Sequence, residues 1–333
     1  MKQGEILLLG DINIDTAWPV SEFPIPGRDG LVDDVTMEIG GAVVNSAILL
    51  DRLGQQTSLL GCVGKDIWAE RIVEKLSQTN INLSSVQTDP DAMTGLNFTI
   101  VTPDGERTMF TQRGANIHQK PQDMNEDAFT HASMLHISGY ALLEAPQRDS
   151  VWRAVELAKK HKVPISLDTG LEPVIKNPED FRKLLSELTV CISGPEEISV
   201  LLGSSSPEEA ANRLISSGIQ LAAIKLGGKG SIVANQREQI FCPAFPVKAI
   251  DSTGAGDSYS AGLLYGWVNG LSLSACAVLA SALGALAVTA YGAGFSLPAK
   301  RALIGFLQTT QIPSVPSVQN GIKELVNYFG KPG

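Results

Sequence analysis

One short segment carries the residue types that a phosphate-handling site needs. Residues 251–257 read DSTGAGD and lead directly into an apolar helical pattern that reaches residue 269. Small residues let a ligand approach the backbone closely, and the free amides at the start of a helix attract an anion. An aspartate in such a place, here Asp257, is useful as a base that takes a proton from a hydroxyl beside the phosphate. A helix-capping aspartate after a glycine turn is the simpler alternative, but capping does not require aspartates at both ends of the turn.

A second glycine turn opens a helical pattern near the amino terminus. Residues 40–45 read GGAVVN, and the apolar pattern continues to residue 53. Upstream of this turn, Asp11, Asn13 and Asp15 fall on one side of an extended chain, because side chains alternate along a strand. Open α/β sheets bind ligands at the carboxyl ends of their strands, where these residues fall. The pattern predicts a site for a polyhydroxy ligand, although the same residue types also form simple Asx turns.

A third glycine-rich segment, residues 225–230, reads KLGGKG and is followed by a strand-like run at 231–234. It is not a P-loop, because it lacks the G-x-x-x-x-G-K-[ST] pattern and no helix follows it. Its residues leave two interpretations open. One is a loop that holds the edge of a nucleotide or a phosphate, and the other is a plain β-hairpin turn.

Short apolar runs alternate with amphipathic helical patterns along most of the chain. The expected buried strands are Ile6–Leu9, Thr57–Cys62, Met134–Ile137, Pro164–Leu167, Val190–Ile192 and Leu221–Leu226. The expected helices lie near 43–53, 66–78, 148–160, 178–187, 207–216, 255–269 and 273–290. This alternation indicates a mostly parallel sheet with helices on both faces.

Two intervals are rich in strand patterns instead. Residues 94–114 alternate as two strands around a Pro-Asp-Gly turn, and residues 16–39 are strand-like with proline and glycine between. Together they predict a small β lid on the α/β body.

The C-terminal tail has a different composition, because 311–319 is a Pro/Ser/Val-rich spacer. Apolar residues at 322, 325, 326 and 329 then predict a short helix that docks on the body or, alternatively, binds a partner.

Composition places the chain in the globular class and excludes several functions. Its 333 residues are 44% hydrophobic and 18% charged, which suits one large α/β core and not a disordered chain. The net charge of −9 disfavours nucleic acid or an anionic membrane as the main partner. The first apolar run is too short for a signal peptide, and the longest apolar region is interrupted by serine and glycine. Four widely spaced cysteines predict buried, reduced thiols and a cytoplasmic protein.

Other catalytic patterns are missing from the sequence. No G-x-G-x-x-G follows the first strand, which disfavours a nicotinamide enzyme, and no G-x-S-x-G supplies a hydrolase nucleophile. The four histidines show no metal-ligand spacing with each other or with cysteine. Because the protein is acidic, a phosphate site must be built locally from backbone amides, a few basic side chains and a metal.

Taken together, these segments resemble the ribokinase family, the pfkB-type carbohydrate kinases. The resemblance covers about residues 5–308 and includes both family signatures, GGAVVN and DSTGAGD, in the family's order. It implies a three-layer αβα sandwich with a mostly parallel central sheet and a small β-sheet lid. The kinase domain would span 1–310, with the tail at 311–333. The implied activity is ATP- and Mg²⁺-dependent phosphorylation of a hydroxymethyl group on a small sugar or related polyol.

The resemblance also implies a role for each matching residue. Asp257 matches the catalytic base, and charge on the transferred phosphoryl group would be stabilised by the amides of Gly254, Ala255 and Gly256. The matching substrate contacts are Asp11, Asn13, Asp15, Gly41, Asn45, Glu144 and the lid arginine Arg107. The matching nucleotide contacts are Lys225, Gly227, Gly230 and Ser281. Glu197 matches the residue that organises Mg²⁺ through water, and a monovalent cation, potassium, would lie among Asp251, Thr253, Ala287, Ala290, Gly292 and Ser296.

One position departs from the family pattern. The family usually has Asn-x-x-Glu before a helix that ends in Leu-Leu-x-Gly, whereas this chain has Gly194 in place of the asparagine, three residues before Glu197. A polar contact near the phosphates or the metal is therefore lost. Ser193 or a water molecule is the expected substitute. The departure bears on metal affinity and leaves the reaction class unchanged.

Several alternatives remain for the acceptor and for the assembly. A nucleoside kinase would need an apolar clamp for the base, for which the lid offers Phe98, Met109 and Phe110. A phosphosugar kinase would need a basic pocket, for which the candidates are Arg28, Arg107 and Arg113. A non-catalytic ligand-binding protein of the same fold is disfavoured, because it gains nothing from an aspartate that faces phosphate. The exposed face of the lid is also expected to serve as a homodimer surface.

Overall fold

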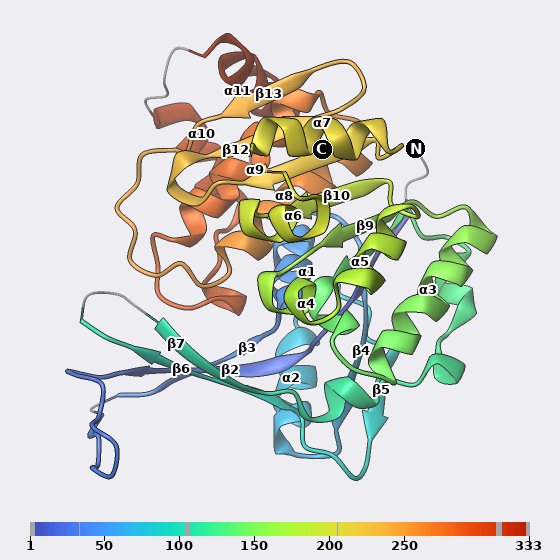
Figure 1. The fold of residues 1–333 in the computed structure, drawn as a ribbon. Helices are drawn as coiled ribbons and strands as arrows, with labels where there is room; N and C mark the ends of the chain where they lie inside the picture. The colour runs from blue at the N-terminus through green and yellow to red at the C-terminus, as the bar shows by residue number, and fades with distance from the viewer. Residues whose placement is uncertain (1–3, 33, 104–106, 205, 311–314, 331–333) are drawn as a thin grey trace.

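Nine strands form one large sheet through the centre of the molecule (Figure 1). The computed structural model describes residues 4–32, 34–103, 107–204, 206–310 and 315–330. In spatial order the strands are β13 (Gln239–Cys242), β12 (Ser231–Ala234), β11 (Leu221–Lys225), β10 (Val190–Ser193), β9 (Ile165–Asp168), β8 (Met134–Ser138), β1 (Ile6–Leu9), β4 (Thr57–Gly64) and β5 (Val86–Asp89). All neighbours from β11 to β5 pair in parallel, and β12 and β13 add an antiparallel edge.

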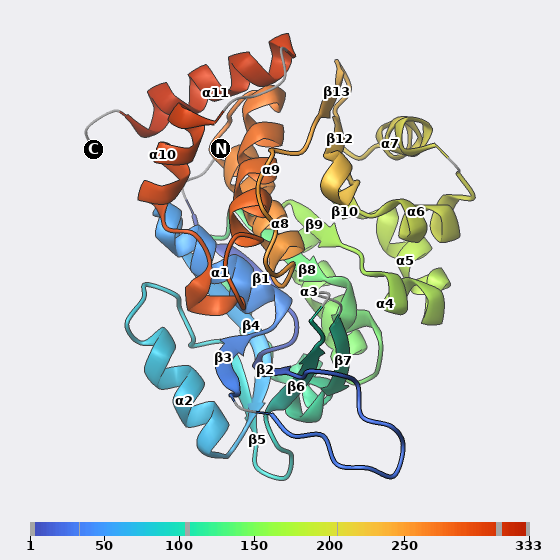
Figure 2. The same ribbon diagram turned by 90° about the vertical axis from the view of Figure 1, so that its left-hand side faces the viewer.

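Helices cover both faces of this sheet, as Figure 2 shows. One face carries α1 (Ala42–Leu53), α2 (Ile67–Leu76), α8 (Ala255–Val268), α9 (Leu273–Ala287), α10 (Lys300–Thr309) and α11 (Pro316–Phe329). The other face carries α3 (Gln147–His161), α4 (Leu171–Lys176), α5 (Pro178–Leu185), α6 (Pro195–Leu202) and α7 (Pro207–Ser216). The three-layer αβα sandwich expected from the sequence is therefore confirmed.

Strand β1 shows why a continuous apolar run suits the centre of this sheet. All four of its side chains are buried, and they alternate between the two hydrophobic cores. Ile6 and Leu8 join the core under α1 and α8, whereas Leu7 and Leu9 join the core under α3. A strand that is covered on both faces needs apolar residues at every position.

A second, four-stranded sheet forms the lid, and it stands apart from the body in Figure 1. Its strands are β3 (Thr36–Gly40), β2 (Asn13–Pro19), β6 (Gly95–Val101) and β7 (Arg107–Gln112), in that order. Strand β2 pairs in parallel with β6, and the other two pairs are antiparallel. Because β2 directly follows β1 and β3 directly precedes α1, the lid is joined to the body where the sequence predicts a ligand site.

Some sequence-based element predictions need correction. Only the two ends of the interval 16–39 are strands, and the described residues between them form an exposed loop. Pro24 and Pro26 lie in that loop and cannot donate backbone hydrogen bonds to a neighbouring strand. Helices α4 and α10 were not expected. Helix α4 has only six residues, whereas α10 does carry an apolar face, in which Leu303 and Leu307 are buried. The 225–230 segment is a hairpin turn that joins β11 to β12 through the 3₁₀ turn η5 (Gly227–Lys229).

Three other expectations can be compared with the structure. The terminal helix α11 packs against α9, with Leu325 and Phe329 buried. All four cysteines are buried and free, as predicted. In the described part of the chain, no helix combines the length and apolar character that a membrane crossing requires.

Candidate functional site

Asp257 lies in the first turn of α8, where two helices meet. Helix α8 begins after Gly254, whose φ of 73° is in the left-handed region that favours glycine. From α1, the Nδ2 of Asn45 donates to the Asp257 carboxylate at 2.7 Å, and Ser46 Oγ donates to the Asp257 carbonyl at 3.1 Å. The Asn45 Oδ1 in turn accepts from the backbone N–H of Gly294 at 2.9 Å. The orientation of the carboxylate is thus fixed by the two signature segments together.

Burial raises the pKa of Asp257 from 3.8 to about 6. The hydrogen bond from Asn45 lowers this pKa, the charge of Asp168 raises it, and the charge of Lys225 lowers it. Desolvation is the largest of these effects because the carboxylate is removed from water. A carboxylate whose pKa lies close to neutrality is suited to accept a proton and release it again.

A polar cavity of about 270 Å³ opens beside Asp257, between the lid and the body. Its lining residues are Asp11, Asn13, Asp15, Gly41, Ala42, Asn45, Asn97, Met109, Thr111, Ser138, Tyr140, Ser252, Thr253, Gly254 and Asp257. Five of the seven predicted substrate contacts therefore share one cavity with the predicted base. The volume suits a small molecule of sugar size.

Hydrogen bonds from the lid and from the 3₁₀ turn that follows it, η1 (Gly114–His118), fix two of these polar side chains. Asn97 on β6 donates its Nδ2 to Asp15 at 2.7 Å, and Asn116 donates its Nδ2 to Asn13 at 2.7 Å. Burial raises the pKa of Asp15 above its ordinary value, although Asn97 and the backbone N–H of Gly41 donate to its carboxylate. The site is therefore preorganised before a ligand binds.

Gly41 allows the close approach of α1 to β1 at this cavity. Its φ is 98°, and a Cβ atom at this position would overlap with the carbonyl oxygen of Asp11. A residue with a side chain fits neither this backbone conformation nor this space.

Arg113 binds the carboxylates of two predicted substrate contacts but does not itself line the cavity. Its guanidinium donates to both oxygens of Asp11, at 2.9 and 3.1 Å, and lies 3.4 Å from the carboxylate of Glu144. It also donates to the carbonyl of Tyr140 and to Gln147. Glu144 does not line the cavity, and its side chain is 56% exposed. The structure therefore places Glu144 at the rim of the substrate site.

A second cavity of about 130 Å³ adjoins the first and shares Asp257 with it. Its charged residues come from the ends of two strands and two helices, and they are Asp168, Glu197, Lys225 and Asp257. Lys225 binds both oxygens of Asp168, at 2.7 and 2.8 Å, and Ser260 donates to Asp168 at 2.7 Å. Burial alone would lower the pKa of Lys225, but the carboxylate of Asp168 outweighs it and the pKa is raised. A permanent cation therefore lies near the start of α8.

Glu197 lies at this second cavity, on α6, beside the unusual Gly194. A Cβ atom at position 194 would overlap with the carboxylate of Glu197. The carboxylate thus occupies space that a larger residue at 194 would fill. No group of three histidine, cysteine, aspartate or glutamate side chains converges on one point in the described residues. The donor set still fits Mg²⁺, which keeps several waters and takes phosphate oxygens with one or two carboxylates.

The predicted nucleotide contacts lie along the hairpin and the neighbouring helix. Gly227 and Gly230 flank the turn between β11 and β12, and both have positive φ. Ser281 on α9 is buried with its Oγ 3.5 Å from that of Ser231 on β12. The structure brings these residues to one edge of the sheet, next to Lys225.

The predicted cation residues also come together. Asp251 accepts from the N–H and Oγ of Thr253, at 2.9 and 2.7 Å, and from the N–H of Gly292 at 2.8 Å. Ala287 ends α9, Ala290 follows in the turn, and Ser296 lies close to Gly292. The loop before α8 is thus tied to the loop after α9.

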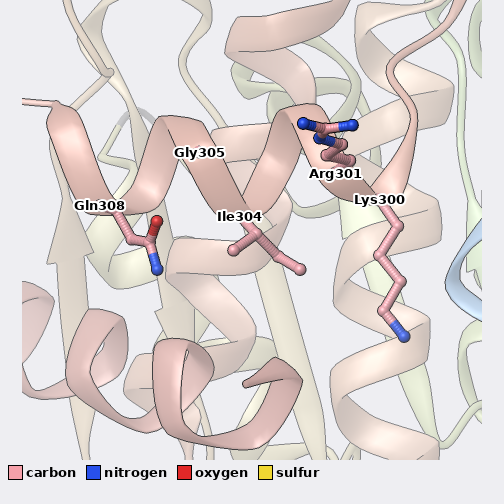
Figure 3. Close-up of a pocket in the computed structure, with 5 residues that line it drawn as sticks. All are labelled: Lys300, Arg301, Ile304, Gly305 and Gln308. Atoms are coloured by element: carbon pink, nitrogen blue, oxygen red, sulfur yellow. The ribbon is translucent and has the colours of Figure 1, made fainter. Parts of the chain in front are cut away.

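A larger hollow of about 550 Å³ lies elsewhere, on α10 (Figure 3). Among the described residues, its lining consists of Lys300, Arg301, Ile304, Gly305 and Gln308 from that one helix. These include none of the predicted site residues, and the hollow opens widely to solvent. Polar groups from several elements converge on the two smaller cavities, which makes those cavities the candidate functional site.

Comparison with known proteins identifies the family. The model of the pfkB family carbohydrate kinases matches residues 3–300. The chain belongs to the pfkB family. The chain is also 30% identical, over 290 residues, to a protein named 5-dehydro-2-deoxygluconokinase 1 from Bacillus cereus, covering 83% of this chain and 87% of that one.

Solved structures agree on the fold of this pfkB protein. An Arabidopsis thaliana ribokinase complexed with ribose and ATP superposes with a TM-score of 0.78 at 24% identity, covering 91% of this chain and 98% of that one. An Escherichia coli protein in complex with ATP and Mg²⁺ gives a TM-score of 0.82 at 22% identity, covering 92% and 99%. The chain is thus similar to ribokinases in fold over nearly its whole length.

Several site residues of this pfkB protein were not predicted from the sequence. They include Asp168, Asn97, Tyr140 and Gln147. The available signal for Asp168 was its place at the end of a buried strand, before a Thr-Gly turn. Asn97 and Gln147 carry no comparable local signal, because they act through contacts with residues far away in the sequence. The side chain of Arg107 lies outside the described residues.

Two alternatives for the acceptor lose most of their proposed residues, although Met109 lines the cavity and the side chain of Arg107 lies outside the described residues. Phe98 and Phe110 pair with each other on the lid face opposite to Asn97 and Met109, so they do not line the cavity. Arg28 lies on the exposed loop, and Arg113 is bound to carboxylates. An aromatic clamp from the lid and a basic pocket from these two arginines are therefore both absent from the described site.

Proposed function

We propose that this protein is an ATP-dependent kinase that phosphorylates a hydroxymethyl group of a small sugar or related polyol, with Asp257 as the general base. The observation that carries the proposal is the position of Asp257. It is partly buried, its pKa is raised to about 6, and it is shared by two adjoining cavities. One cavity suits a polyol, and the other gathers Lys225, two further carboxylates and the start of a helix.

Each part of the site has a distinct task in phosphoryl transfer. The cavity under the lid orients the acceptor so that its hydroxyl hydrogen faces the carboxylate of Asp257, which takes the proton as the oxygen attacks. We expect the amides of Gly254 and Gly256 to face the transferred group, where the helix dipole favours negative charge. The N–H of Ala255 already donates to the carbonyl of Ser252 at 3.3 Å. Lys225 adds positive charge to the same region.

Bound ATP supplies the phosphoryl group, and Mg²⁺ neutralises part of its charge. Glu197 is the residue we expect to hold Mg²⁺ through water, with Asp168 close by in the same cavity. The hairpin glycines and Ser281 lie where the rest of the nucleotide would bind. Closure of the lid would exclude water and limit wasteful hydrolysis of ATP.

The names of the relatives favour a sugar-derived acceptor over a nucleoside. A 5-dehydro-2-deoxygluconokinase is named for a derivative of a six-carbon sugar acid, and a ribokinase for a pentose. Nucleoside phosphorylation stays the second candidate, because Tyr140 and Met109 line the cavity and could contact a base.

The proposal is tested by substrate-dependent release of ADP from Mg·ATP across pentoses, hexoses, polyols, sugar acids, nucleosides and sugar phosphates. Replacing Asp257 by Asn is expected to lower turnover by about 10²- to 10⁴-fold. Near-normal turnover of a folded Asp257→Asn variant would exclude the role of base. Failure to bind Mg·ATP would support a non-catalytic protein instead.

We also propose that potassium stimulates the enzyme through the loops around Asp251. These loops touch the start of α8, so a cation held there would stabilise the amides that face the phosphoryl group. Replacing KCl by LiCl at constant ionic strength is expected to lower turnover. Equal rates in both salts would contradict the proposal.

The remaining proposals concern assembly and location. The outer face of the lid carries Trp18, Phe98 and Phe110 on one side of the sheet, and Phe110 is 57% exposed. An apolar face of this kind is suited to pair with a second copy of the chain.

Four free buried cysteines and the use of ATP fit a cytoplasmic enzyme.

A further inference from the structure

We propose that the acceptor cavity selects a neutral polyol or sugar and discriminates against sugar acids and sugar phosphates. The inference rests on the proposed function and narrows its substrate class. The juxtaposition that carries it is an uncharged or acidic lining on every described side of the cavity, next to Arg113, whose guanidinium is already bound to carboxylates.

The first argument is the charge of the lining. Three carboxylates, those of Asp11, Asp15 and Asp257, line the cavity, and no lysine, arginine or histidine among the described residues does so. A second negative charge inside this space would lie close to these groups in a partly dry site, where like charges repel strongly. The phosphoryl group to be transferred adds further negative charge next to it.

The second argument is that the nearby arginine is not free. The guanidinium of Arg113 forms a bidentate pair with Asp11 and also reaches Glu144. Only 11% of its side chain is exposed, and it does not line the cavity. Its charge is therefore balanced inside the protein, so a substrate carboxylate would have to displace Asp11 to reach it.

The third argument is the balance of donors and acceptors. Asn97 lines the cavity and is only 7% exposed, and its Oδ1 has no hydrogen-bond partner among the described residues. Its Nδ2 donates a hydrogen bond to the carboxylate of Asp15, which fixes the orientation of the Asn97 amide. An unpartnered buried acceptor and several carboxylate oxygens need donors. Sugar hydroxyls supply donors, whereas carboxylates and phosphates supply only acceptors.

The test compares sets of neutral and anionic ligands on the whole protein: D-ribose with D-ribonate and ribose 1-phosphate, D-glucose with D-gluconate, L-sorbose with 5-keto-D-gluconate, and D-fructose with fructose 1-phosphate. Dissociation constants are measured by calorimetry, and kcat/KM by ADP release. In at least one set, the neutral member is expected to bind and react at least about tenfold better than its anionic counterparts. The proposal is overturned if no neutral member binds more tightly than its anionic counterparts.

The two measurements separate this inference from the proposed function. Tighter binding of a neutral member without ADP release would support charge selection and contradict the kinase proposal. ADP release from acids at rates equal to or above those of the neutral members would overturn charge selection and support the kinase proposal.

Variants identify the groups responsible. Asp11→Asn removes the carboxylate that pairs with Arg113, so the arginine's charge becomes available to an anionic ligand. The ratio of the dissociation constants of anionic and neutral ligands is therefore expected to fall by about tenfold or more. Asp11→Asn/Arg113→Met, which removes both partners of the ion pair, is expected to bind anions no more weakly than the wild type does. Weaker binding of anions to this double variant, or to Arg107→Gln on the lid, would show that an arginine serves an acidic substrate and would overturn the proposal.

Discussion

The Asp257 carboxylate is held where its charge is unfavourable to folding. Burial raises its pKa from 3.8 to about 6, so the folded protein binds a proton more tightly than the unfolded chain does. The stability this proton provides is fully present below pH 3.8 and is lost as pH rises through about 6. Above that pH, the ionised carboxylate lowers the free energy of unfolding by about 2–3 kcal/mol.

The first prediction follows from the upward shift in the pKa of Asp257. Asp257→Asn is expected to raise the free energy of unfolding at pH 8 by about 1–3 kcal/mol while activity falls. The gain should shrink toward zero as pH falls from about 6 to below 4, because the wild-type carboxyl then becomes neutral. Urea unfolding at pH 4.5 and pH 8 measures the difference. An equal gain at both pH values would contradict the assigned pKa.

The second prediction concerns activity against pH. The wild-type kcat/KM is expected to fall below about pH 6, because a protonated Asp257 cannot accept the hydroxyl proton. The residual activity of Asp257→Asn should lack this acid limb. A wild-type profile that stays flat down to pH 4.5 would argue against Asp257 as the base.

The third prediction concerns the buried ion pair between Lys225 and Asp168. Removing one partner of such a pair leaves an uncompensated charge, so Lys225→Met is expected to lower the free energy of unfolding by about 1–3 kcal/mol. The double variant with Asp168→Asn should recover part of this loss. Lys176→Met is the matched control, because Lys176 pairs with Glu172 on the surface and should change stability by less than about 0.5 kcal/mol. Similar losses in both lysine variants would contradict the structural reasoning.

At the scale of the elements, the position of Asp257 depends on how closely α8 packs on α9. Gly262 on α8 faces the backbone of α9, and a Cβ atom there would lie 2.8 Å from the Cα of Ala280. The two helices form the most extensive helix contact of the described structure, and both helices are apolar almost all round. The start of α8 therefore cannot shift without disturbing the core beneath it.

The fourth prediction uses this contact. Gly262→Ala is expected to lower the free energy of unfolding by about 1–3 kcal/mol, since the core has no room for the methyl group. Gly305→Ala is the matched control, because Gly305 lies in α10 with no atom near its Cβ position. Alanine there should raise stability by up to about 1 kcal/mol. Thermal unfolding of both variants measures the two changes. A Gly262→Ala variant with unchanged stability would show that α8 and α9 can separate freely.

At the scale of the whole molecule, the lid has two faces with different chemistry. Strand alternation directs Asp15, Asn97 and Met109 toward the cavity, whereas Phe98 and Phe110 lie on the other side. The outer pair is close to Trp18, whose ring centroid is 6.2 Å from that of Phe98. A sheet that is polar toward its ligand and apolar outside is suited to cover a substrate and pair with another lid.

The fifth prediction is that the protein sediments as a dimer at micromolar concentration. Phe110→Glu should shift it toward the monomer, because a charge in the centre of an apolar interface is unfavourable. Ile175→Glu, at an exposed apolar position on α4 away from the lid, is the control and should leave the dimer intact. A wild-type monomer at all concentrations would exclude pairing through the lid.

Local patterns in the sequence are enough to predict the layered fold and the small-residue turn that opens α8. Apolar runs such as Ile6–Leu9 can only be buried on both faces, and the segment 251–257 can only form a small-residue turn before a helix. Both features depend on residues that are close together in the sequence, so local patterns are enough to predict them. The loop within 16–39 was mistaken for strand, because β propensity there is overridden by prolines that cannot pair.

Which charges line the cavities depends on contacts between residues that are far apart in the sequence. Asp168 lies 57 residues before Lys225, whose ammonium it binds, and 89 residues before Asp257, and Arg113 reaches Asp11 across 102 residues. An arginine in the sequence indicates positive charge, but its partner decides whether that charge is available to a substrate. Long-range pairing and burial set both the pKa of Asp257 and the acidic lining of the cavity, and neither depends on neighbours along the chain.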